Sequence, residues 1–201
     1  RWYQFLIEVF EEDHELIAFV QKSLGYSITG STREQVAFFC YGIGANGKSV
    51  LFKIIKSVLG DYAWYAPHTF FQVNPYATNS NDLAATERKR FLVASETMNN
   101  SKINEQRLKS LTGGDTQKAR FLYGEYFDFE PTVKPWLFVN HRPKVSDDSY
   151  GFWRRVRLIP FLRVFQGYEQ DPNLLEELLG EKAGILNWLI EGALLWQKEG
   201  L

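Results

Sequence analysis

Hydrophobic and polar positions alternate along this 201-residue chain in two different ways, each typical of one kind of element. Short apolar runs suit buried strands, and they occur at residues 35–41, 63–66, 91–96, 136–139 and within 153–161. Apolar residues spaced three or four apart suit helices, and they occur within 1–30, 50–59, 103–111 and 183–198. The pattern therefore predicts a chain in which helices and strands are interleaved.

The first 30 residues are predicted to be helical and separate from the rest. One apolar stripe runs from Trp2 to Phe10, and a second helix carries Leu16 and Val20 and stops at Gly25. We see no chemistry in this segment and interpret it as a packing annex. Residues 31–201 would then form the main domain.

The middle of the chain contains a loop, a short helix and a hairpin by the same reasoning. Residues 72–83 are polar and turn-rich and are typical of a loop, while residues 83–90 suit a short basic helix. Two aromatic-rich strands within 118–129 flank a turn near Tyr123. Lys118 and Arg120 stand two positions apart in this hairpin, so we expect them to project from one face.

One segment carries a recognisable phosphate-binding pattern. Residues 42–49 read Gly-Ile-Gly-Ala-Asn-Gly-Lys-Ser, which fits G-x-x-x-x-G-K-[S/T], between a predicted strand and a predicted helix that Gly60 closes. Glycines let backbone N–H groups turn inward around phosphate oxygens, and the helix N-terminus adds partial positive charge. We therefore expect a nucleotide at this loop, with Lys48 on the β/γ-phosphates and Ser49 on Mg²⁺. The expected contacts come from Gly42, Gly44, Ala45, Asn46, Gly47, Lys48, Ser49 and Val50.

Two later strands end in polar residues suited to the same reaction. Glu96 ends the run 91–96, and an acid at the tip of a strand near a P-loop governs Mg²⁺ and the attacking water. Asn140 follows the run 136–139, where an amide can touch the γ-phosphate or the water. The alternative for Asn140 is a plain turn residue ahead of Pro143.

Composition narrows the function classes further. The chain is 45% hydrophobic and 16% aromatic, so it is globular, and its net charge of −1 argues against bulk affinity for nucleic acid. Any such binding must come from a local feature. Cys40 is expected to be a small buried hydrophobe in a reducing compartment. The three histidines, His14, His68 and His141, lack metal-ligand spacing.

The ends of the sequence and its apolar runs give two more expectations. No apolar stretch is long enough to span a membrane, and there is no signal peptide. The chain begins at Arg1 and not at Met, so we expect a fragment of a longer protein.

Taken in order, the motifs resemble those of superfamily 3 helicases. The nearest likeness is to the helicase part of the phage and plasmid primase family and of poxvirus-type primase-helicases. The matching segments are 41–49, the strand end Ser95-Glu96, Leu111-Thr112-Gly113-Gly114-Asp115, 139–143 and Trp153-Arg154-Arg155-Val156. The likeness extends to residues 24–26 and 196–201, so it covers nearly the whole chain.

This resemblance implies a fold, an activity and partners. The fold is an α/β P-loop NTPase of AAA+ type, with a central parallel sheet flanked by helices and an inserted β-hairpin. The activity is ATP hydrolysis with Mg²⁺, which drives 3′ to 5′ translocation of a hexameric ring along single-stranded DNA. An upstream primase domain and a place in the cytoplasm of the host cell of a phage, plasmid or virus are also implied.

The resemblance also assigns roles to residues of this chain. Gly47, Lys48 and Ser49 fall on the phosphate and Mg²⁺ site, and Glu96 falls on the Walker B acid. Asn140 falls on the polar sensor. Arg155 falls on the arginine finger, and it is preferred to Arg154 because Arg155-Val156 matches an Arg–apolar pair in viral relatives.

Two positions depart from the pattern of these helicases. Ser95 stands where many relatives carry a first acid, so Glu96 must serve both the metal and the water, or Ser95 must help. The hairpin tip reads Leu122-Tyr123-Gly124-Glu125, without the basic residues that grip DNA in viral relatives. Lys118, Arg120 or base stacking by Tyr123 could take over that contact.

Two other classes of function compete with a DNA-translocating ATPase. A P-loop small-molecule kinase needs a substrate pocket and a lid with its own arginines, and it has no use for a hairpin between the acid and sensor strands. A nucleotide-regulated scaffold without motor activity needs no hydrolytic set such as Glu96, Asn140 and Arg155. The sequence therefore favours the translocating ATPase.

Overall fold

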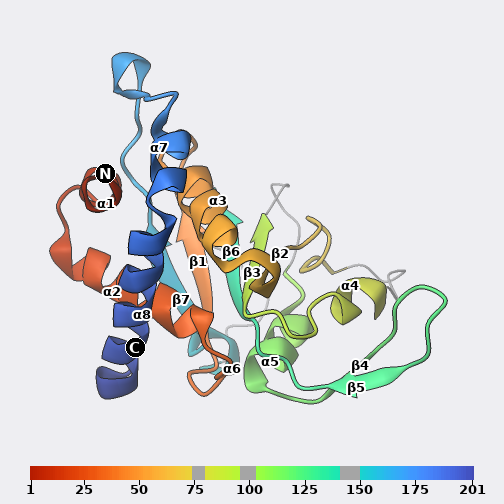
Figure 1. Cartoon of the computed structure of the whole chain (residues 1–201). Helices are drawn as coiled ribbons and strands as arrows, with labels where there is room; N and C mark the ends of the chain where they lie inside the picture. The colour runs from red at the N-terminus through yellow and green to blue at the C-terminus, as the bar shows by residue number, and fades with distance from the viewer. Residues whose placement is uncertain (74–79, 96–102, 141–149) are drawn as a thin grey trace.

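The computed structural model describes residues 1–73, 80–95, 103–140 and 150–201 and places five parallel strands in one sheet. The strand order is β2-β3-β6-β1-β7, and every neighbouring pair is parallel (Figure 1). The strands are β1 (Ala37–Tyr41), β2 (Ala63–Tyr65), β3 (Phe91–Ser95), β6 (Lys134–Val139) and β7 (Val156–Pro160). An α/β fold with a central parallel sheet is thus confirmed.

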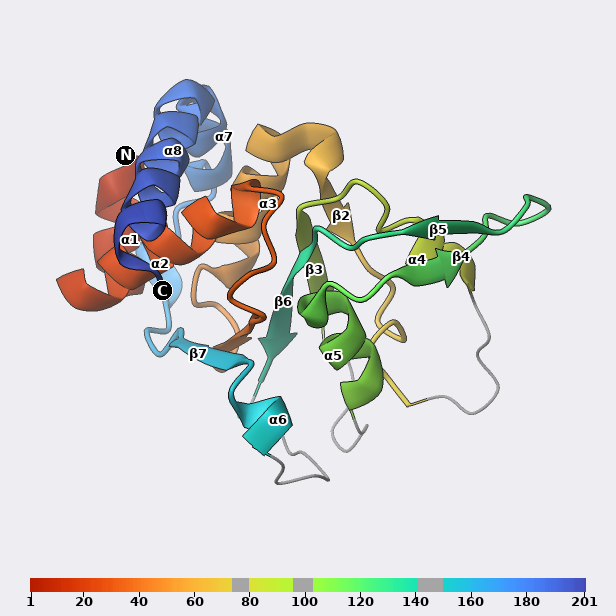
Figure 2. The same ribbon diagram turned by 90° about the horizontal axis from the view of Figure 1, so that it is seen from below.

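Helices cover both faces of this sheet, because successive strand residues point to opposite sides. Phe38 and Cys40 of β1 join one hydrophobic cluster, while Ala37 and Phe39 join the other. The first cluster includes residues of α1 (Trp2–Val9), α2 (His14–Ile28), α3 (Lys48–Leu59), α7 (Leu174–Gly180) and α8 (Lys182–Glu199). The second includes residues of α5 (Glu105–Gly113) and α6 (Tyr150–Trp153), which lie on the other side of the sheet (Figure 2). The short 3₁₀ turns are η1 (Gly60–Tyr62) and η2 (Gly167–Glu169).

Helix α2 does not stop at Gly25, and this prediction was wrong. The helix continues to Ile28, because Gly25 and Gly192 form the crossing point of α2 and α8. A Cβ atom on Gly25 would overlap backbone atoms of Gly192 and Ala193, and one on Gly192 would overlap the Gln21 carbonyl. The two glycines therefore serve close backbone approach and not helix termination.

This crossing makes a prediction about stability. Gly192→Ala is expected to lower the free energy of unfolding by ~3 kcal/mol, because the methyl group meets backbone that cannot move without separating α2 from α8. Gly184→Ala on the same helix is the control, since a Cβ there meets open space, and alanine should stabilise it by ~0.5–1 kcal/mol. Urea unfolding of both variants measures the difference. Equal urea midpoints for Gly192→Ala and Gly184→Ala would show that the crossing tolerates a methyl group.

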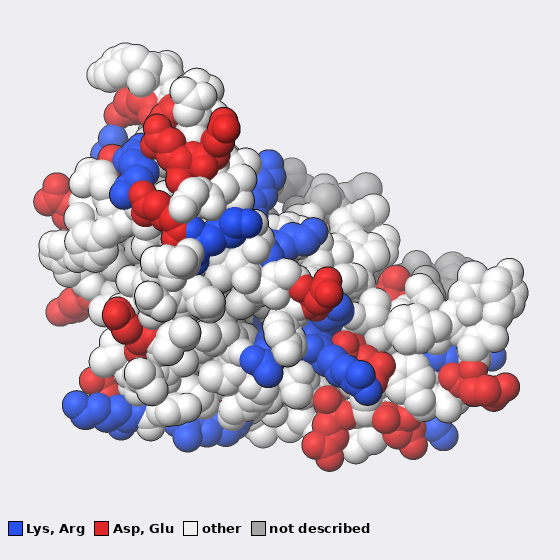
Figure 3. All heavy atoms as spheres, viewed as in Figure 1, with Lys and Arg blue, Asp and Glu red and all other residues white. Residues whose placement is uncertain are grey.

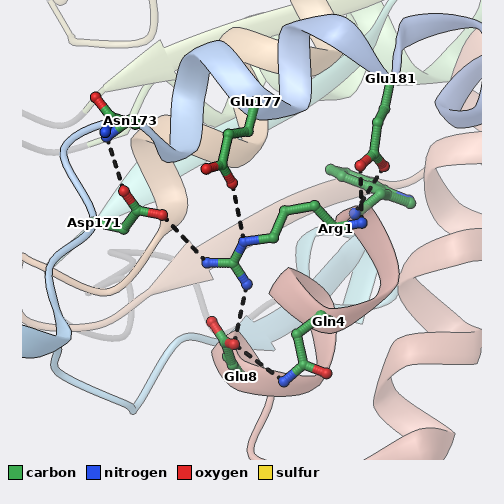
Figure 4. Close-up of polar contacts among 8 residues, drawn as sticks. Arg1, Gln4, Glu8, Asp171, Asn173, Glu177 and Glu181 are labelled. Atoms are coloured by element: carbon green, nitrogen blue, oxygen red, sulfur yellow. Dashed lines mark hydrogen bonds and ion pairs between the residues drawn. The ribbon is translucent and has the colours of Figure 1, made fainter.

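Helices α1 and α2 share their hydrophobic core with the rest of the chain. Phe5, Leu6 and Leu24 are at most 1% exposed, in the cluster that also contains Trp136 of β6. The Arg1 guanidinium adds ion pairs to Glu8, Asp171 and Glu177 at 3.1, 3.7 and 3.5 Å (Figure 4). The predicted annex thus packs directly on the C-terminal helices, and the domain boundary at residue 30 stays a prediction.

The predicted hairpin is present, but the basic helix beside it is not where the sequence placed it. Strands β4 (Gln117–Ala119) and β5 (Phe127–Phe129) pair antiparallel and project from the body (Figures 1 and 2). Helix α4 spans Ser80–Ala84, largely inside the predicted loop, and successive turns follow it with Arg88 at φ +58°. The Asn81 side chain accepts a hydrogen bond from the Leu122 N–H at 3.1 Å, so contact with the hairpin helps to fix α4 in this position.

Candidate functional site

The predicted phosphate loop lies at the carboxyl end of β1 and leads directly into α3. Three of its residues have positive φ, at +150° for Gly42, +51° for Ala45 and +81° for Gly47. A Cβ on Gly42 would overlap the Phe161 carbonyl oxygen. The backbone path of the loop therefore requires glycine at Gly42 for space and favours it at Gly47 for conformation.

Neighbouring strands hold the loop in place through backbone and amide hydrogen bonds. The Gly42 N–H donates to the Val139 carbonyl at the end of β6, at 3.3 Å. The Asn46 amide, 3% exposed, donates to the Phe161 carbonyl after β7, at 3.0 Å. The Phe165 N–H donates to the Ala45 carbonyl at 2.8 Å. Because the end of β6 and the segment that follows β7 both fix it, the loop is preorganised.

Lys48 and Ser49 form the first turn of α3, as the motif requires. Lys48 is 8% exposed, its ammonium donates to the Gly42 carbonyl at 2.5 Å, and burial lowers its pKa. Ser49 and Val50 follow it in the helix, and Ser49 is exposed together with Gly44 and Ala45. The open backbone N–H groups at the start of α3 and the lysine charge suit a polyphosphate.

Helix α1 supports this loop from behind, which the sequence did not indicate. A Cβ on Gly47 would lie 2.6 Å from Cγ2 of Val9 and 3.3 Å from the Phe5 ring. Phe10 also packs on Phe161, with ring centroids 5.1 Å apart. The apolar stripe of residues 2–10 was visible in the sequence, but nothing local identified the P-loop as its partner.

The strands that precede Asn140 and Glu96 in the sequence, β6 and β3, end at the same edge of the sheet. Tyr41, the last residue of β1, is in register with Val139 of β6, and Ser95 of β3 is in register with Phe138. Asn140 therefore follows β6 beside the start of the phosphate loop, and it is exposed. Glu96 would follow β3 one strand further along, but it lies outside the described residues.

Arg155 lies at the opposite edge of the sheet, at the amino end of β7. Its carbonyl accepts the Ala37 N–H at 2.8 Å, where β1 begins. Its guanidinium donates to the Thr112 hydroxyl at 3.2 Å and to the Gly151 carbonyl at 2.8 Å. Burial and the neighbouring Arg154 lower its pKa. The length of β1, roughly 16 Å, separates Arg155 from the P-loop of its own chain.

Arg154 is the more exposed of the two adjacent arginines. Its guanidinium donates to the Gln35 side chain at 2.7 Å, and its carbonyl accepts from Arg157 at 3.0 Å. Both arginines lie at the amino end of β7, so their position in the fold does not show which of them is the arginine finger.

The hairpin carries aromatic rings and charges of both signs. Lys118 is paired with Asp128 across the hairpin. Residues 117–130 contain two basic side chains and three acidic ones, Glu125, Asp128 and Glu130. On the face shown in Figure 3, basic and acidic groups are likewise interspersed. Tyr123 at the tip is 98% exposed, so the hairpin offers ring surface more than net positive charge.

Sequence reasoning missed two further rings in this hairpin. Phe121 and Tyr126 are 47% and 56% exposed, and the Arg120 guanidinium lies 4.8 Å from the centroid of Tyr126. The alternation of aromatic residues through 121–129 was a usable signal. It could not show how much of each ring faces solvent, since Phe121 is half exposed and also stacks on Phe127, with ring centroids 5.8 Å apart.

Other candidate chemistry is absent from the described part of the chain. Residues 1–73, 80–95, 103–140 and 150–201 contain no group of three or more His, Cys, Asp or Glu side chains able to hold a metal. His141 lies outside these ranges. Cys40 is free and fully buried, and burial raises the pKa of its thiol. None of the described helices is long and apolar enough to cross a membrane.

A protein-family model matches residues 40–155, from the end of β1 to the arginine that precedes β7. Its description is "Family of unknown function (DUF5906)". The chain belongs to the DUF5906 family. The match includes the phosphate loop, both polar strand ends, the hairpin and Arg155, so these features lie within the region that defines the family.

Viral proteins are similar to this DUF5906 chain over most of its length. It is 30% identical over 95% of its residues to "Putative helicase L207/L206" of Acanthamoeba polyphaga mimivirus, of which it spans 22%. It is 30% identical over 73% of its residues to "Putative helicase 022R" of Frog virus 3, of which it spans 16%. The DUF5906 chain therefore corresponds to about a fifth of these relatives.

Solved structures share the fold of the DUF5906 chain. The apo structure of the NrS-1 C terminal region superposes with a TM-score of 0.72 at 18% identity, over 94% of this chain and 44% of that one. A second structure of that region, residues 305–718, gives a TM-score of 0.71 at 17% identity. At such identity the likeness shows a common fold.

Proposed function

We propose that this DUF5906 chain is the motor domain of a DNA helicase that hydrolyses ATP. The observation that carries the proposal is the edge of the sheet where the Gly42–Gly47 loop, Lys48, Ser49 and Asn140 meet. Such an edge, outside the carboxyl ends of parallel strands, is where α/β folds bind their ligands. The viral relatives named as helicases support DNA as the partner.

The residues at this edge suit MgATP. The positive-φ positions of the loop would let backbone N–H groups turn toward a polyphosphate, and Lys48 would neutralise charge on its β/γ end. The Ser49 hydroxyl, exposed at the first turn of α3, would bind Mg²⁺ with Glu96. Bound Mg²⁺ would neutralise the charge that develops on the transferred phosphoryl group. Asn140 would orient the attacking water or touch the γ-phosphate.

The sheet order supports a motor of AAA+ type within superfamily 3. The P-loop strand β1 is central, the acid strand β3 and the sensor strand β6 lie on one side, and β7 lies on the other. The hairpin β4–β5 is inserted between the acid and sensor strands, away from the sheet. In this proposal the chains form a hexameric ring, each hairpin points into the channel, and translocation runs 3′ to 5′. An upstream primase domain belongs to the same proposal.

Two other functions use the P-loop without the hairpin. A small-molecule kinase would phosphorylate an acceptor and would be indifferent to DNA. A nucleotide-regulated scaffold would bind ATP and turn it over no faster with DNA than without. The projecting hairpin, with Tyr123 nearly fully exposed, favours the translocating ATPase over both.

The test is ATP hydrolysis by the full-length protein with and without single-stranded DNA. A helicase motor should release phosphate from ATP and do so faster when DNA is present. Hydrolysis that ignores DNA but responds to a small hydroxylic acceptor would favour the kinase. Nucleotide binding without turnover, with or without DNA, would favour the scaffold.

The hairpin gives a second, separate prediction about DNA binding. The double variant Lys118→Ala, Arg120→Ala should lower the salt slope of single-strand binding by about 0.7 for each phosphate that the protein no longer neutralises. Tyr123→Ala should weaken binding by ~1–3 kcal/mol with little change of slope, because stacking does not release counterions. Fluorescence anisotropy at several salt concentrations separates the two effects. If neither affinity nor slope changes, these side chains are a solvated strand face.

A further inference from the structure

Thr112 connects the last turn of α5 to the Arg155 guanidinium. Its side chain is 2% exposed, and its hydroxyl donates to the Leu108 carbonyl at 2.8 Å. The same oxygen accepts a hydrogen bond from Nε of Arg155 at 3.2 Å. A threonine hydroxyl has one proton and two lone pairs, so it can serve both partners at once. The position of the arginine is thus linked to the position of α5.

Helix α5 in turn leads directly into the hairpin. Gly114 ends the helix in the left-handed conformation at φ +78°, and β4 begins at Gln117. The Gln117 amide donates to the Asp115 carbonyl at 2.7 Å and also accepts from the Ser110 hydroxyl at 3.4 Å. The base of the hairpin is therefore fastened to the same end of α5 that contains Thr112.

Asp115 adds a charge to this connection. Its carboxylate acts on Arg155 electrostatically and counteracts the effects of burial and of Arg154 on the pKa of that guanidinium. Asp115 is exposed, and it precedes β4 by two residues. Both groups that attract the guanidinium from this side, the Thr112 hydroxyl and the Asp115 carboxylate, thus belong to the α5–β4 segment.

We propose that Thr112 is a positioning residue that couples the hairpin to Arg155, with the Asp115 carboxylate in a supporting role. A strand of DNA that moves the hairpin would shift the last turn of α5 and with it the guanidinium. This inference rests on the proposed function, because Arg155 is taken to act on the nucleotide of a neighbouring chain. The coupling would make hydrolysis in one subunit depend on whether its neighbour holds DNA.

The experiment compares Thr112→Val, Thr112→Ser and a matched control, Thr86→Val, in the full-length protein. Valine has the shape of threonine but no hydroxyl, while serine keeps the hydroxyl. Thr86 is also fully buried, and its hydroxyl donates to the Leu83 carbonyl at 2.7 Å. The control therefore removes the same kind of local hydrogen bond, after α4 and outside the α5–β4 segment. The readout is the ratio of ATPase rates with and without single-stranded DNA.

We expect the ratio to fall about tenfold in Thr112→Val, which corresponds to one hydrogen bond to a charged group. Thr112→Ser and Thr86→Val should keep the wild-type ratio, and the affinity of Thr112→Val for single-stranded DNA should not change. Asp115→Asn, an exposed and nearly isosteric change, should also lower the ratio and serves if Thr112→Val does not fold.

Two outcomes separate this inference from the proposed function. If DNA stimulates the wild type and Thr112→Val and Asp115→Asn respond equally well, the coupling is wrong and the helicase motor stands. If DNA leaves the wild-type ATPase unchanged, the proposed function is wrong and the coupling falls with it. An equal loss of stimulation in Thr86→Val would also overturn the coupling, because it would trace the effect to general destabilisation.

Discussion

Replacing Lys48 by alanine is expected to abolish ATP turnover or to slow it by at least about a hundredfold. The ammonium belongs to the first residue of α3, and the surrounding loop is fixed by hydrogen bonds with the end of β6 and with the segment after β7. Losing one fixed donor to a developing anion costs roughly 10²–10³ in rate. Phosphate release measured at saturating and limiting ATP gives the size of the loss.

Glu96→Gln, at the residue that follows β3 in the sequence, is the companion change. It should keep ATP binding and lose hydrolysis, because an amide cannot act as a base and serves Mg²⁺ poorly. The fluorescence of a bound nucleotide analogue measures binding separately from turnover. Wild-type hydrolysis in Glu96→Gln would show that another residue, with Ser95 as the first to examine, does this work.

Arg155→Ala is expected to bind ATP almost normally and to hydrolyse it far more slowly. An arginine finger is worth roughly 10³–10⁵ in rate, or ~4–7 kcal/mol of barrier. Arg155 stands at the amino end of β7 and the P-loop at the carboxyl end of β1, so the arginine cannot reach the nucleotide of its own chain. We therefore expect it to act on the nucleotide of a neighbour.

A mixing experiment tests this arrangement directly. Lys48→Ala has a dead pocket and an intact finger, while Arg155→Ala has the reverse. In mixed rings some interfaces combine the good pocket of one variant with the good finger of the other. ATPase activity should then exceed the sum of the two separate proteins. Arg154→Ala, which alters the adjacent and more exposed arginine, is the matched control and should retain most of its activity.

Other outcomes would assign the arginine finger to a different residue or show that neither arginine acts as one. If mixed oligomers form and activity does not return, Arg155 does not act between chains. A large loss of ATPase activity in Arg154→Ala, together with recovery when that variant is mixed with Lys48→Ala, would assign the finger to Arg154. A loss in neither variant would leave the arginines at the start of β7 as structural groups of the sheet edge.

The strands and the phosphate loop could be predicted from the sequence because their signals are local. The run before Gly42 and the helix after Lys48 need no knowledge of distant residues, and the hairpin follows from its aromatic alternation. The same holds for Cys40, whose apolar neighbours in the chain become its neighbours in the core. The roles of Glu96 and Asn140 were predicted from their positions at strand ends and agree with the family resemblance, that of Arg155 came from the resemblance alone, and all three remain predictions.

What the sequence did not reveal depends on contacts between distant segments. Strand β6 begins at Lys134, two residues before the predicted start, because this lysine is 1% exposed and donates to the carbonyls of Thr29, Ser31 and Thr132. Burial lowers its pKa to about 7. A lysine argues against a buried strand unless its partners are known, and two of them here belong to a distant part of the sequence. Helix α7 and the shift of α4 were missed for the same reason, since short helices are fixed by their packing.

The α2–α8 crossing also has a consequence for the chain during its synthesis. Helix α2 emerges from the ribosome early and α8 late, yet each presents a glycine that fits the backbone of the other. Strand β1 likewise waits for β6 and β7, which are its two neighbours in the sheet. During synthesis the edges of β1 therefore remain unpaired until β6 and β7 have been made, and the side of α2 that packs on α8 remains uncovered until α8 has been made. We infer that a nascent chain halted before α8 leaves the α8-facing side of α2 exposed and is prone to aggregation or capture by chaperones.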